Sequence, residues 1–341
     1  MKQDLRRRRV GNSDVETTVL GLGGAPLGNL FSTIPEEIAR ATIVAAAEGG
    51  IGYFDTAPQY GHGVSEHRFG HVLREMPRES YVLSTKVGRL LRPWRGDRPE
   101  PSAFCKTQSF SVHHDYSYDA TMRSMEDSYQ RLGLARIDIA LIHDVDRRHQ
   151  GHNYDRCFDQ AVNGAVRALT ELKAAGIIGA IGLGVNEVAP CMEFACAVPL
   201  DAYMLAGRYT LLEQDGVESL LDMAASQGFS LIVAGPFNSG ILAAGSGAAT
   251  TYNYVPANDA IRVRVAAFER VCAAHTVSLA AVALQFPLLQ PAVCTVVTGA
   301  VRPEEITQNA ALMAAQVPAA LWRALVVEGL LDARWLNGAD A

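Results

Sequence analysis

The sequence has no CxxC pair, no apolar run long enough to cross a bilayer, and no excess of basic residues. Its six cysteines are scattered, which is typical of buried thiols in a reducing compartment rather than of a disulfide framework. No apolar stretch follows the basic quartet Arg6–Arg9, as a signal peptide would require. We therefore expect a cytoplasmic protein without a membrane-spanning segment.

The charge balance disfavours nucleic acid as a partner. The chain has 30 Lys and Arg against 36 Asp and Glu, a net charge of −6, whereas phosphate binding needs a basic surface. We interpret Arg6–Arg9 as an exposed edge before the first strand, with contact to a membrane or nucleic acid as the alternative. The length of 341 residues and the hydrophobic content of 49% fit one globular domain over residues 1–341.

A GxGxxG turn is also missing after the first predicted strand, where the segment Gly21–Pro26 has Pro in the place of a helix start. This absence disfavours an open doubly wound sheet, which is the competing architecture. Short β-rich runs instead alternate with helical patterns along the chain. Eight such repeats predict an α/β fold of the (β/α)8 TIM barrel type, in which strand side chains fill the core.

The predicted strands are Val19–Leu22, Gly52–Asp55, Val82–Lys86, Ile137–His143, Ala180–Val185, Ala202–Leu205, Ser230–Val233 and Cys294–Thr298. The predicted crossover helices lie near Pro35–Glu48, Ser65–Arg74, Tyr118–Arg131, Ala161–Ala175, Glu187–Cys196, Val217–Gln227, Asp259–Ala274 and Arg302–Met313. Residues 6–18 contain a Gly11-Asn12 turn and predict an N-terminal hairpin under the barrel floor. Extra C-terminal helices are expected at Ser278–Leu289 and Ala319–Ala333.

Four side chains that can carry chemistry follow the second, third and fourth strands: Asp55, Tyr60, Lys86 and His143. In a parallel barrel these positions converge on one mouth. A Lys86 ammonium beside the Tyr60 phenol would favour the phenolate and lower its pKa, which is about 10 in a free side chain. Asp55 would keep Lys86 charged and fixed, and a neutral His143 would orient the reacting oxygen. The four residues are therefore predicted to transfer a proton.

Three segments carry a resemblance to a known family. Gly52–Gly61, Leu83–Gly88 and Ile139–Asp144 are similar to the signature blocks of the aldo-keto reductases, and the resemblance covers most of the chain. That family has a (β/α)8 barrel, a nicotinamide cofactor and an Asp, Tyr, Lys, His tetrad. The resemblance implies a catalytic role for the four side chains named above and a reaction that needs no metal.

The resemblance also implies where the nicotinamide lies. Asn186 matches the Asn that holds the carboxamide, but the family's preceding Ser is Val185 here and a Gln after the sixth strand is replaced near Ala206. The aromatic residue that stacks on the nicotinamide aligns with Ala234, so Phe237 is the candidate to pack there instead. The residues expected to contact this end of the cofactor are Asn186, Pro236, Phe237 and Gly240.

The segment after the last strand resembles the adenosine-binding part of the family. Relatives that prefer NADP have basic residues at the positions of Gly299 and Glu305, where they hold the 2′-phosphate. A carboxylate repels that phosphate but accepts hydrogen bonds from ribose hydroxyls, so NAD is expected over NADP. Arg302 could still reach a 2′-phosphate, which leaves NADP open. Gln308 and Asn309 are expected to face the adenine, or else to be ordinary polar residues of a helical first turn.

A finer resemblance is to a branch that oxidises sugars, the D-threo-aldose 1-dehydrogenases, and it is carried by Gly23–Gly28, Asp115–Asp119 and Ala206–Gln214. It implies oxidation of the C1 hydroxyl of an aldose such as L-fucose or D-arabinose to the lactone, with Tyr60 as general acid or base. Pyridoxal 4-dehydrogenases are a neighbouring branch and remain an alternative. A general NADPH-dependent aldehyde reductase and a non-catalytic, cofactor-sensing partner subunit are the others.

The substrate, a small sugar or aldehyde, is expected between the long loops 87–117, 144–160 and 235–257, because loops after the strands carry the site of a barrel. Candidates to stack on a sugar face are Trp94, Phe110 and Tyr116, and candidates to bind its hydroxyls are Asp144, Arg208 and Asn238. His113 and His114 lack two further ligands in the sequence and are interpreted as surface residues. The oligomeric state stays open.

Overall fold

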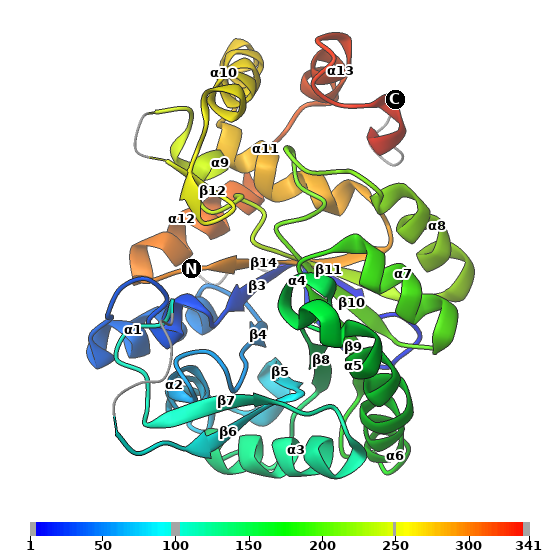
Figure 1. Ribbon diagram of the computed structural model, residues 1–341. Helices are drawn as coiled ribbons and strands as arrows, with labels where there is room; N and C mark the ends of the chain where they lie inside the picture. The colour runs from blue at the N-terminus through cyan, green and yellow to red at the C-terminus, as the bar shows by residue number, and fades with distance from the viewer. Residues whose placement is uncertain (1–4, 97–102, 248–249, 337–341) are drawn as a thin grey trace.

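Eight parallel strands close into a barrel with the neighbour order β10-β11-β14-β3-β4-β5-β8-β9 (Figure 1). The computed structural model describes residues 5–96, 103–247 and 250–336. The barrel strands are β3 (Leu20–Gly23), β4 (Tyr53–Asp55), β5 (Val82–Val87), β8 (Ile139–His143), β9 (Ala180–Val185), β10 (Ala202–Ala206), β11 (Ser230–Ala234) and β14 (Val293–Gly299). The predicted (β/α)8 barrel is confirmed, and each predicted strand agrees with an observed one to within two residues at either end.

Helices surround the barrel (Figure 1). They are α1 (Glu36–Glu48), α2 (Val64–Leu73), α3 (Tyr118–Leu132), α6 (Val166–Ala174), α7 (Val188–Ala197), α8 (Val217–Gln227), α10 (Asp259–Ala274), α11 (Leu279–Gln285), α12 (Pro303–Ala314) and α13 (Ala319–Val327). The helices next to the barrel bury an apolar face in a core that includes Ile43, Phe69 and Leu169. Short 3-10 turns lie at η1 (Pro26–Gly28), η2 (Arg78–Ser80), η5 (Phe286–Leu289) and η6 (Ala333–Leu336).

The helix that covers the barrel between β11 and β14 is not the predicted one. Asp259–Ala274 was expected there, but α10 packs on α11 and α13 at the periphery (Figure 1), whereas η5, which continues α11, packs on β14. The extra helix is therefore α10. The periodicity of apolar residues could not show which of Asp259–Ala274 and Ser278–Leu289 covers the barrel, because both segments have apolar residues at helical spacing.

The expected helix Ala161–Ala175 is also different, since it begins with a π-helical turn, η4 (Ala161–Ala165), before α6. Gly164 in this turn lies against the chain before α3, and a Cβ on it would be 2.7 Å from the Tyr116 carbonyl oxygen. The close approach explains the irregular turn, because an extra residue there lets the helix follow that backbone.

The N-terminal hairpin, β1 (Arg7–Arg9) with β2 (Glu16–Thr18), closes the barrel floor as predicted. Val10 is fully buried in the cluster inside the barrel, together with Tyr53, Leu141 and Ile232. The opposite end of the barrel, where the strands finish, is covered by the three long loops.

These three loops contain elements that the sequence did not predict. Residues 87–117 form the antiparallel pair β6 (Arg89–Pro93) and β7 (Phe110–His114), and residues 144–160 form α4 (Arg147–Gln150), η3 (Gly151–Asn153) and α5 (Tyr154–Gln160). Residues 235–257 contain α9 (Ile241–Ala244) and the small pair β12 (Thr251–Tyr252) and β13 (Val255–Pro256). In the described residues no single helix is long and apolar enough to span a membrane, although two bent helix pairs reach that length and composition together. All six cysteines are free thiols.

Candidate active site

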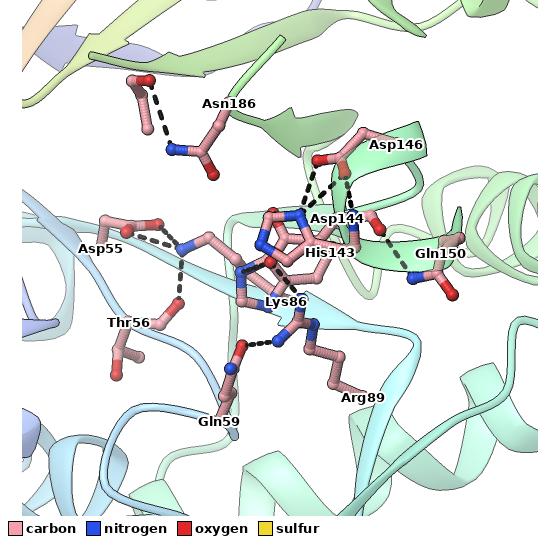
Figure 2. Close-up of polar contacts among 12 residues, drawn as sticks. Asp55, Thr56, Gln59, Lys86, Arg89, His143, Asp144, Asp146, Gln150 and Asn186 are labelled. Atoms are coloured by element: carbon pink, nitrogen blue, oxygen red, sulfur yellow. Dashed lines mark hydrogen bonds and ion pairs between the residues drawn. The ribbon is translucent and has the colours of Figure 1, made fainter. Parts of the chain in front are cut away.

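A buried ion pair joins the ends of β4 and β5. The Lys86 Nζ lies 2.7 Å from both carboxylate oxygens of Asp55 and donates a third hydrogen bond to the Thr56 carbonyl at 2.9 Å (Figure 2). Asp55 also accepts from the Ser84 hydroxyl at 2.7 Å. Both charged side chains are almost fully buried, and a buried charge needs such partners to be tolerated. The pair fixes Lys86 at the barrel mouth.

Tyr60 lies on the loop after β4, between the Lys86 ammonium and the His143 imidazole. The Lys86 Nζ is 4.8 Å from the centre of its ring, and the His143 ring meets it edge-on with centroids 5.9 Å apart. Burial raises the pKa of Tyr60 well above its usual value, and the Asp55 and Asp144 carboxylates add to the rise. Arg89 opposes this rise. The expected lowering of the pKa by Lys86 stays a prediction.

His143 ends β8 with its Nε2 at 3.3 Å from Asp144 Oδ2. Burial lowers the pKa of His143 well below its usual value, and the cations Arg89 and Lys86 add to this effect. The lowered pKa favours the uncharged ring at neutral pH, and the carboxylate oxygen beside Nε2 favours the tautomer with the proton on Nε2. Nδ1 is buried without a hydrogen-bond partner among the described residues.

Arg89 is a site residue that the sequence reasoning missed. It begins β6, and its guanidinium is buried beside His143, where NH1 donates to Gln59 Oε1 and NH2 pairs with Asp144 Oδ2 at 2.5 Å (Figure 2). The available signal was a charged residue three positions after Lys86, followed directly by the apolar pair Leu90-Leu91. A cation in such a run is rarely buried unless it is paired.

Tyr116 was expected to stack on a sugar, and that prediction is wrong. Its side chain is fully buried, and its hydroxyl donates to the His143 carbonyl at 2.8 Å while accepting from Gln150 Nε2 at 2.9 Å. Gln150 also donates to the Asp144 carbonyl at 2.8 Å. Tyr116 therefore supports the end of β8 from below.

Three potential metal ligands, Asp144, Asp146 and His149, lie together in the part of the chain that the structure describes. Their ligand atoms already have partners, since Asp146 caps α4 by accepting from the His149 backbone and ring nitrogens, both at 2.8 Å. Asp144 is paired with Arg89. The group is explained by these contacts. His113 and His114 are exposed at the end of β7, as surface residues are, although burial of the ring and Arg89 lower the pKa of His114 to about 4.

The barrel mouth leaves room for a planar ring near the expected nicotinamide site. Gly207 and Gly235, at the ends of β10 and β11, have positive φ angles of 69° and 63°, and a Cβ on Gly207 would meet no atom within 4 Å. Asn186 lies beside them and donates to the Ala206 carbonyl at 3.3 Å. Backbone without side chains is what allows a flat group to approach closely, so these residues fit a nicotinamide.

The other residues expected at this end divide into two groups. Gly240 has a φ of 103° and open space around it, as a close contact to a ligand requires. Pro236 is buried, and Phe237 is half-buried against the core between barrel and helices. Phe237 is thus held by the core, which does not support its expected place on the nicotinamide.

At the adenosine end, Gly299 is fixed by packing, because a Cβ on it would lie 2.6 Å from Pro26 Cγ. Glu305 accepts from the Val301 backbone nitrogen at 2.8 Å and from Arg302 Nε at 2.9 Å. Its carboxylate therefore stabilises the start of α12 and restrains Arg302. Asn309 is buried and donates to Thr298 Oγ1 at 3.2 Å, so its first role is to join α12 to β14.

Gln308 and the remaining substrate candidates lie at different depths. Gln308 and Trp94 are exposed, and Phe110 is half-buried on the β6–β7 pair. Arg208 binds the Gly207 carbonyl at 2.9 Å. Asn238 is buried, accepts from Thr210 Oγ1 at 2.5 Å and donates to the Gly207 carbonyl at 3.2 Å, so the expectation that it binds a sugar hydroxyl is wrong.

Three aromatic side chains near the site were not predicted. The Phe104 ring lies 5.9 Å from the Tyr60 ring, and the exposed rings of Phe31 and Tyr254 meet at 5.8 Å. Phe104 comes from the segment before β7, Phe31 from the loop after β3, and Tyr254 from the β12–β13 turn. The mouth beside Tyr60 is therefore apolar on one side and charged, through Arg89 and Asp144, on the other.

Comparison with known proteins matches residues 19–326 to the aldo/keto reductase family. The pyridoxal 4-dehydrogenase of Microbacterium luteolum is 41% identical over 96% of this chain and 98% of its own length. The D-threo-aldose 1-dehydrogenase of a Pseudomonas species is 38% identical over 92% of this chain and 94% of its own. Among solved structures, an aldo-keto reductase of Bacillus halodurans covers 96% of this chain and 97% of its own, with a TM-score of 0.74 at 24% identity, and so supports the fold.

Proposed function

The chain belongs to the aldo/keto reductase family, and from this premise we propose that it oxidises a cyclic hemiacetal, in the first place an aldose at C1, to the lactone. The observation that carries the proposal is the meeting of Tyr60, Lys86, Asp55 and His143 at one barrel mouth. A proton-transferring phenol between an ammonium and an uncharged imidazole suits the removal of a proton from a hydroxyl.

The names of the two relatives, taken together, support a narrower substrate class than either name does alone. An aldose and pyridoxal are both aldehydes that carry a hydroxyl within reach, so each closes to a cyclic hemiacetal. Loss of hydride from the hemiacetal carbon and of the proton from its hydroxyl gives a lactone in both cases. Pyridoxal is therefore the second candidate substrate, favoured by the 41% identity of the chain to a pyridoxal 4-dehydrogenase.

A nicotinamide bound near Asn186, Gly207 and Gly235 would supply the acceptor for the hydride. The chain's own residues handle the proton: the Tyr60 oxygen takes it from the hemiacetal hydroxyl as the carbon–oxygen double bond forms. Lys86 stabilises the phenolate before this transfer. His143 would orient the reacting oxygen with its Nε2–H, for which the ring rotates away from Asp144. In the reverse direction Tyr60 is the acid.

NAD is the proposed cofactor. Gly299 offers no basic side chain, and its contact with Pro26 leaves no room for one. Glu305 places a carboxylate at the second position and holds Arg302 by a hydrogen bond, so both features weaken binding of a 2′-phosphate. An enzyme that uses NAD, which cells keep mostly oxidised, is suited to oxidation.

The test is a comparison of NAD and NADP with L-fucose, D-arabinose, L-galactose, D-glucose and pyridoxal, followed by the absorbance of reduced nicotinamide. We expect NAD-dependent turnover of the sugars that share one configuration from C2 to C4, with D-glucose inert. Turnover of pyridoxal alone would favour the second candidate. Activity only in the reduction of simple aldehydes with NADPH would replace the proposal with a general aldehyde reductase. No turnover, with cofactor binding intact, would favour the non-catalytic partner.

A further inference from the structure

Asp144 is the residue next to His143, and its carboxylate faces the imidazole. Asp144 has a φ of 51°, a left-handed conformation that is unfavourable for a non-glycine residue and is kept only where the surroundings enforce it. The conformation brings Asp144 Oδ2 to 3.3 Å from His143 Nε2. A carboxylate at this distance normally raises the pKa of an imidazole and favours the charged ring.

Arg89 competes with His143 for the same carboxylate oxygen. Its NH2 is 2.5 Å from Asp144 Oδ2, which is closer than the imidazole, and the guanidinium and carboxylate side chains are only 5% and 9% exposed. Gln59 accepts from the other end of the guanidinium, so Arg89 is held at two points (Figure 2). An arginine keeps its charge in any such environment.

The other groups that face His143 do not replace Arg89. Lys86, on β5, is bound by Asp55, and His114, on β7, is uncharged at neutral pH because its pKa is lowered to about 4. His149, on α4, lies 2.8 Å from Asp146 and 3.8 Å from Asp144. After burial, Arg89 is the largest influence that lowers the pKa of His143. Burial raises the pKa of Asp144, and Arg89 opposes that rise.

We propose that Arg89 is a positioning residue of the active site: it binds Asp144 as its own counterion, so that His143 stays uncharged with its proton on Nε2. In this role Arg89 contacts neither substrate nor cofactor. It weakens the hold of Asp144 on the Nε2–H, so that the imidazole ring can rotate and present this hydrogen to the reacting oxygen. The use of this hydrogen in catalysis rests on the proposed function, whereas the charge and tautomer of His143 can be measured without any substrate.

The experiment is an NMR titration of the histidine ring nitrogens and carbons in the full-length protein. The chain has nine histidines, and the signals of His143 are identified as those missing from His143→Gln. In the wild type we expect a neutral ring with the proton on Nε2 throughout the neutral range. In Arg89→Gln, which keeps a polar side chain without the charge, we expect the pKa of His143 to rise by about 1 to 3 pH units.

A double variant separates electrostatics from structural damage. Arg89→Gln with Asp144→Asn removes both charges, and we expect it to return His143 to the neutral form, which a disrupted fold would not do. Arg89→Lys keeps a cation and should leave His143 neutral. Arg92→Gln is the matched control, because Arg92 is exposed on the same strand, and it should leave the His143 titration unchanged.

Two results would overturn the proposal. One is a charged His143 at neutral pH in the wild type, a measurement that needs no variant and so holds even if Arg89→Gln does not fold. The other is an unchanged His143 titration in folded Arg89→Gln. If the titrations follow expectation while no hemiacetal is oxidised, the proposed substrate is wrong and the role of Arg89 stands. If a sugar is oxidised but either overturning result is obtained, the proposed function stands and the role of Arg89 is wrong.

Discussion

At the residue scale, two buried ion pairs flank two uncharged rings. Lys86 with Asp55 and Arg89 with Asp144 each neutralise a charge, and Tyr60 lies within reach of both pairs. The result is a site that contains four full charges and yet leaves its phenol protonated and its imidazole neutral at rest. Burial then works in one direction, toward the uncharged forms.

Tyr60→Phe removes the proton-transferring hydroxyl and little else. We expect kcat to fall by about 100-fold or more, the range of general acid–base catalysis, while nicotinamide binding, measured by fluorescence titration, stays within about twofold. Tyr118→Phe is the control, since Tyr118 is on the outer helix α3 and bonds Glu171 instead. Loss of cofactor binding in Tyr60→Phe would mean that the hydroxyl also holds the cofactor, and would contradict a role limited to proton transfer.

The raised pKa of Tyr60 predicts different pH dependences for oxidation and for reduction, which kinetics can measure. Oxidation needs the phenolate, which is the minor form below the pKa, so kcat/KM for oxidation should rise about tenfold per pH unit toward high pH. Reduction needs the phenol, which is already the major form, so its rate should be flat over the same range. Initial rates in both directions across neutral to alkaline pH measure this. A flat oxidation profile would contradict a Tyr60 held protonated.

Glu305→Gln tests the proposed preference for NAD. The change removes the negative charge and loosens Arg302, which then can reach a 2′-phosphate. We expect the ratio of kcat/KM for NADP over NAD to rise by about tenfold, the effect of one charge-assisted hydrogen bond gained. Glu304→Gln, one position earlier and exposed, removes the same charge without freeing Arg302 and should leave the ratio nearly unchanged. Equal ratios in the two variants would contradict the role of Glu305.

Residues could be predicted where chemistry and strand position agreed. Asp55, Lys86 and His143 each end a barrel strand, and the structure brings them together with Tyr60 as expected. Tyr116 and Asn238 could not be placed correctly, because an aromatic or amide in a loop looks the same in sequence whether it faces solvent or supports a backbone. Arg89 was missed since its partner, Asp144, is far away in the chain.

At the element scale, the strands were predictable because parallel strands buried on both faces read as short, nearly continuous apolar runs. The pairs β6–β7 and β12–β13 were not: β12–β13 is short and mostly exposed, and β6 and β7 lie outside the barrel, where only Arg89, Leu90 and Leu91 are buried. The exchange of α10 and α11 has a similar cause. Both are rich in apolar residues, and only the packing of η5 on β14 shows which covers the barrel.

Gly70→Ala tests how closely two of these elements pack. A Cβ on Gly70, in α2, would lie 2.0 Å from the Leu132 carbonyl oxygen at the end of α3, so the helices must separate. We expect the free energy of unfolding to fall by about 1 to 3 kcal/mol in urea denaturation, the usual cost of overpacking, although alanine favours helix. Gly247→Ala, at an exposed glycine with no atom within 4 Å, is the control and should be nearly neutral. An unchanged Gly70→Ala would contradict the observed contact.

At the scale of the whole molecule, the barrel is closed by its first and last strands. β3 and β14 are neighbours in the sheet, so neither half of the chain keeps a complete core when the other is removed. The N-terminal hairpin adds a second connection, because Val10 enters the barrel interior and β1 lies against β14. Unfolding should therefore be one transition, in which the two ends of the chain separate together.

Arg8→Met tests this closure. The Arg8 guanidinium donates to the carbonyls of Val293 at 2.5 Å, Leu288 at 2.9 Å and Gln290 at 3.1 Å, which ties the hairpin to the entrance of β14. We expect a loss of about 1.5 to 3 kcal/mol, as for hydrogen bonds to a charged group, with a single transition and an unchanged denaturant slope. Arg7→Met, exposed on the same strand, should cost much less. A separate early transition in Arg8→Met would show that the hairpin unfolds by itself and does not hold the barrel closed.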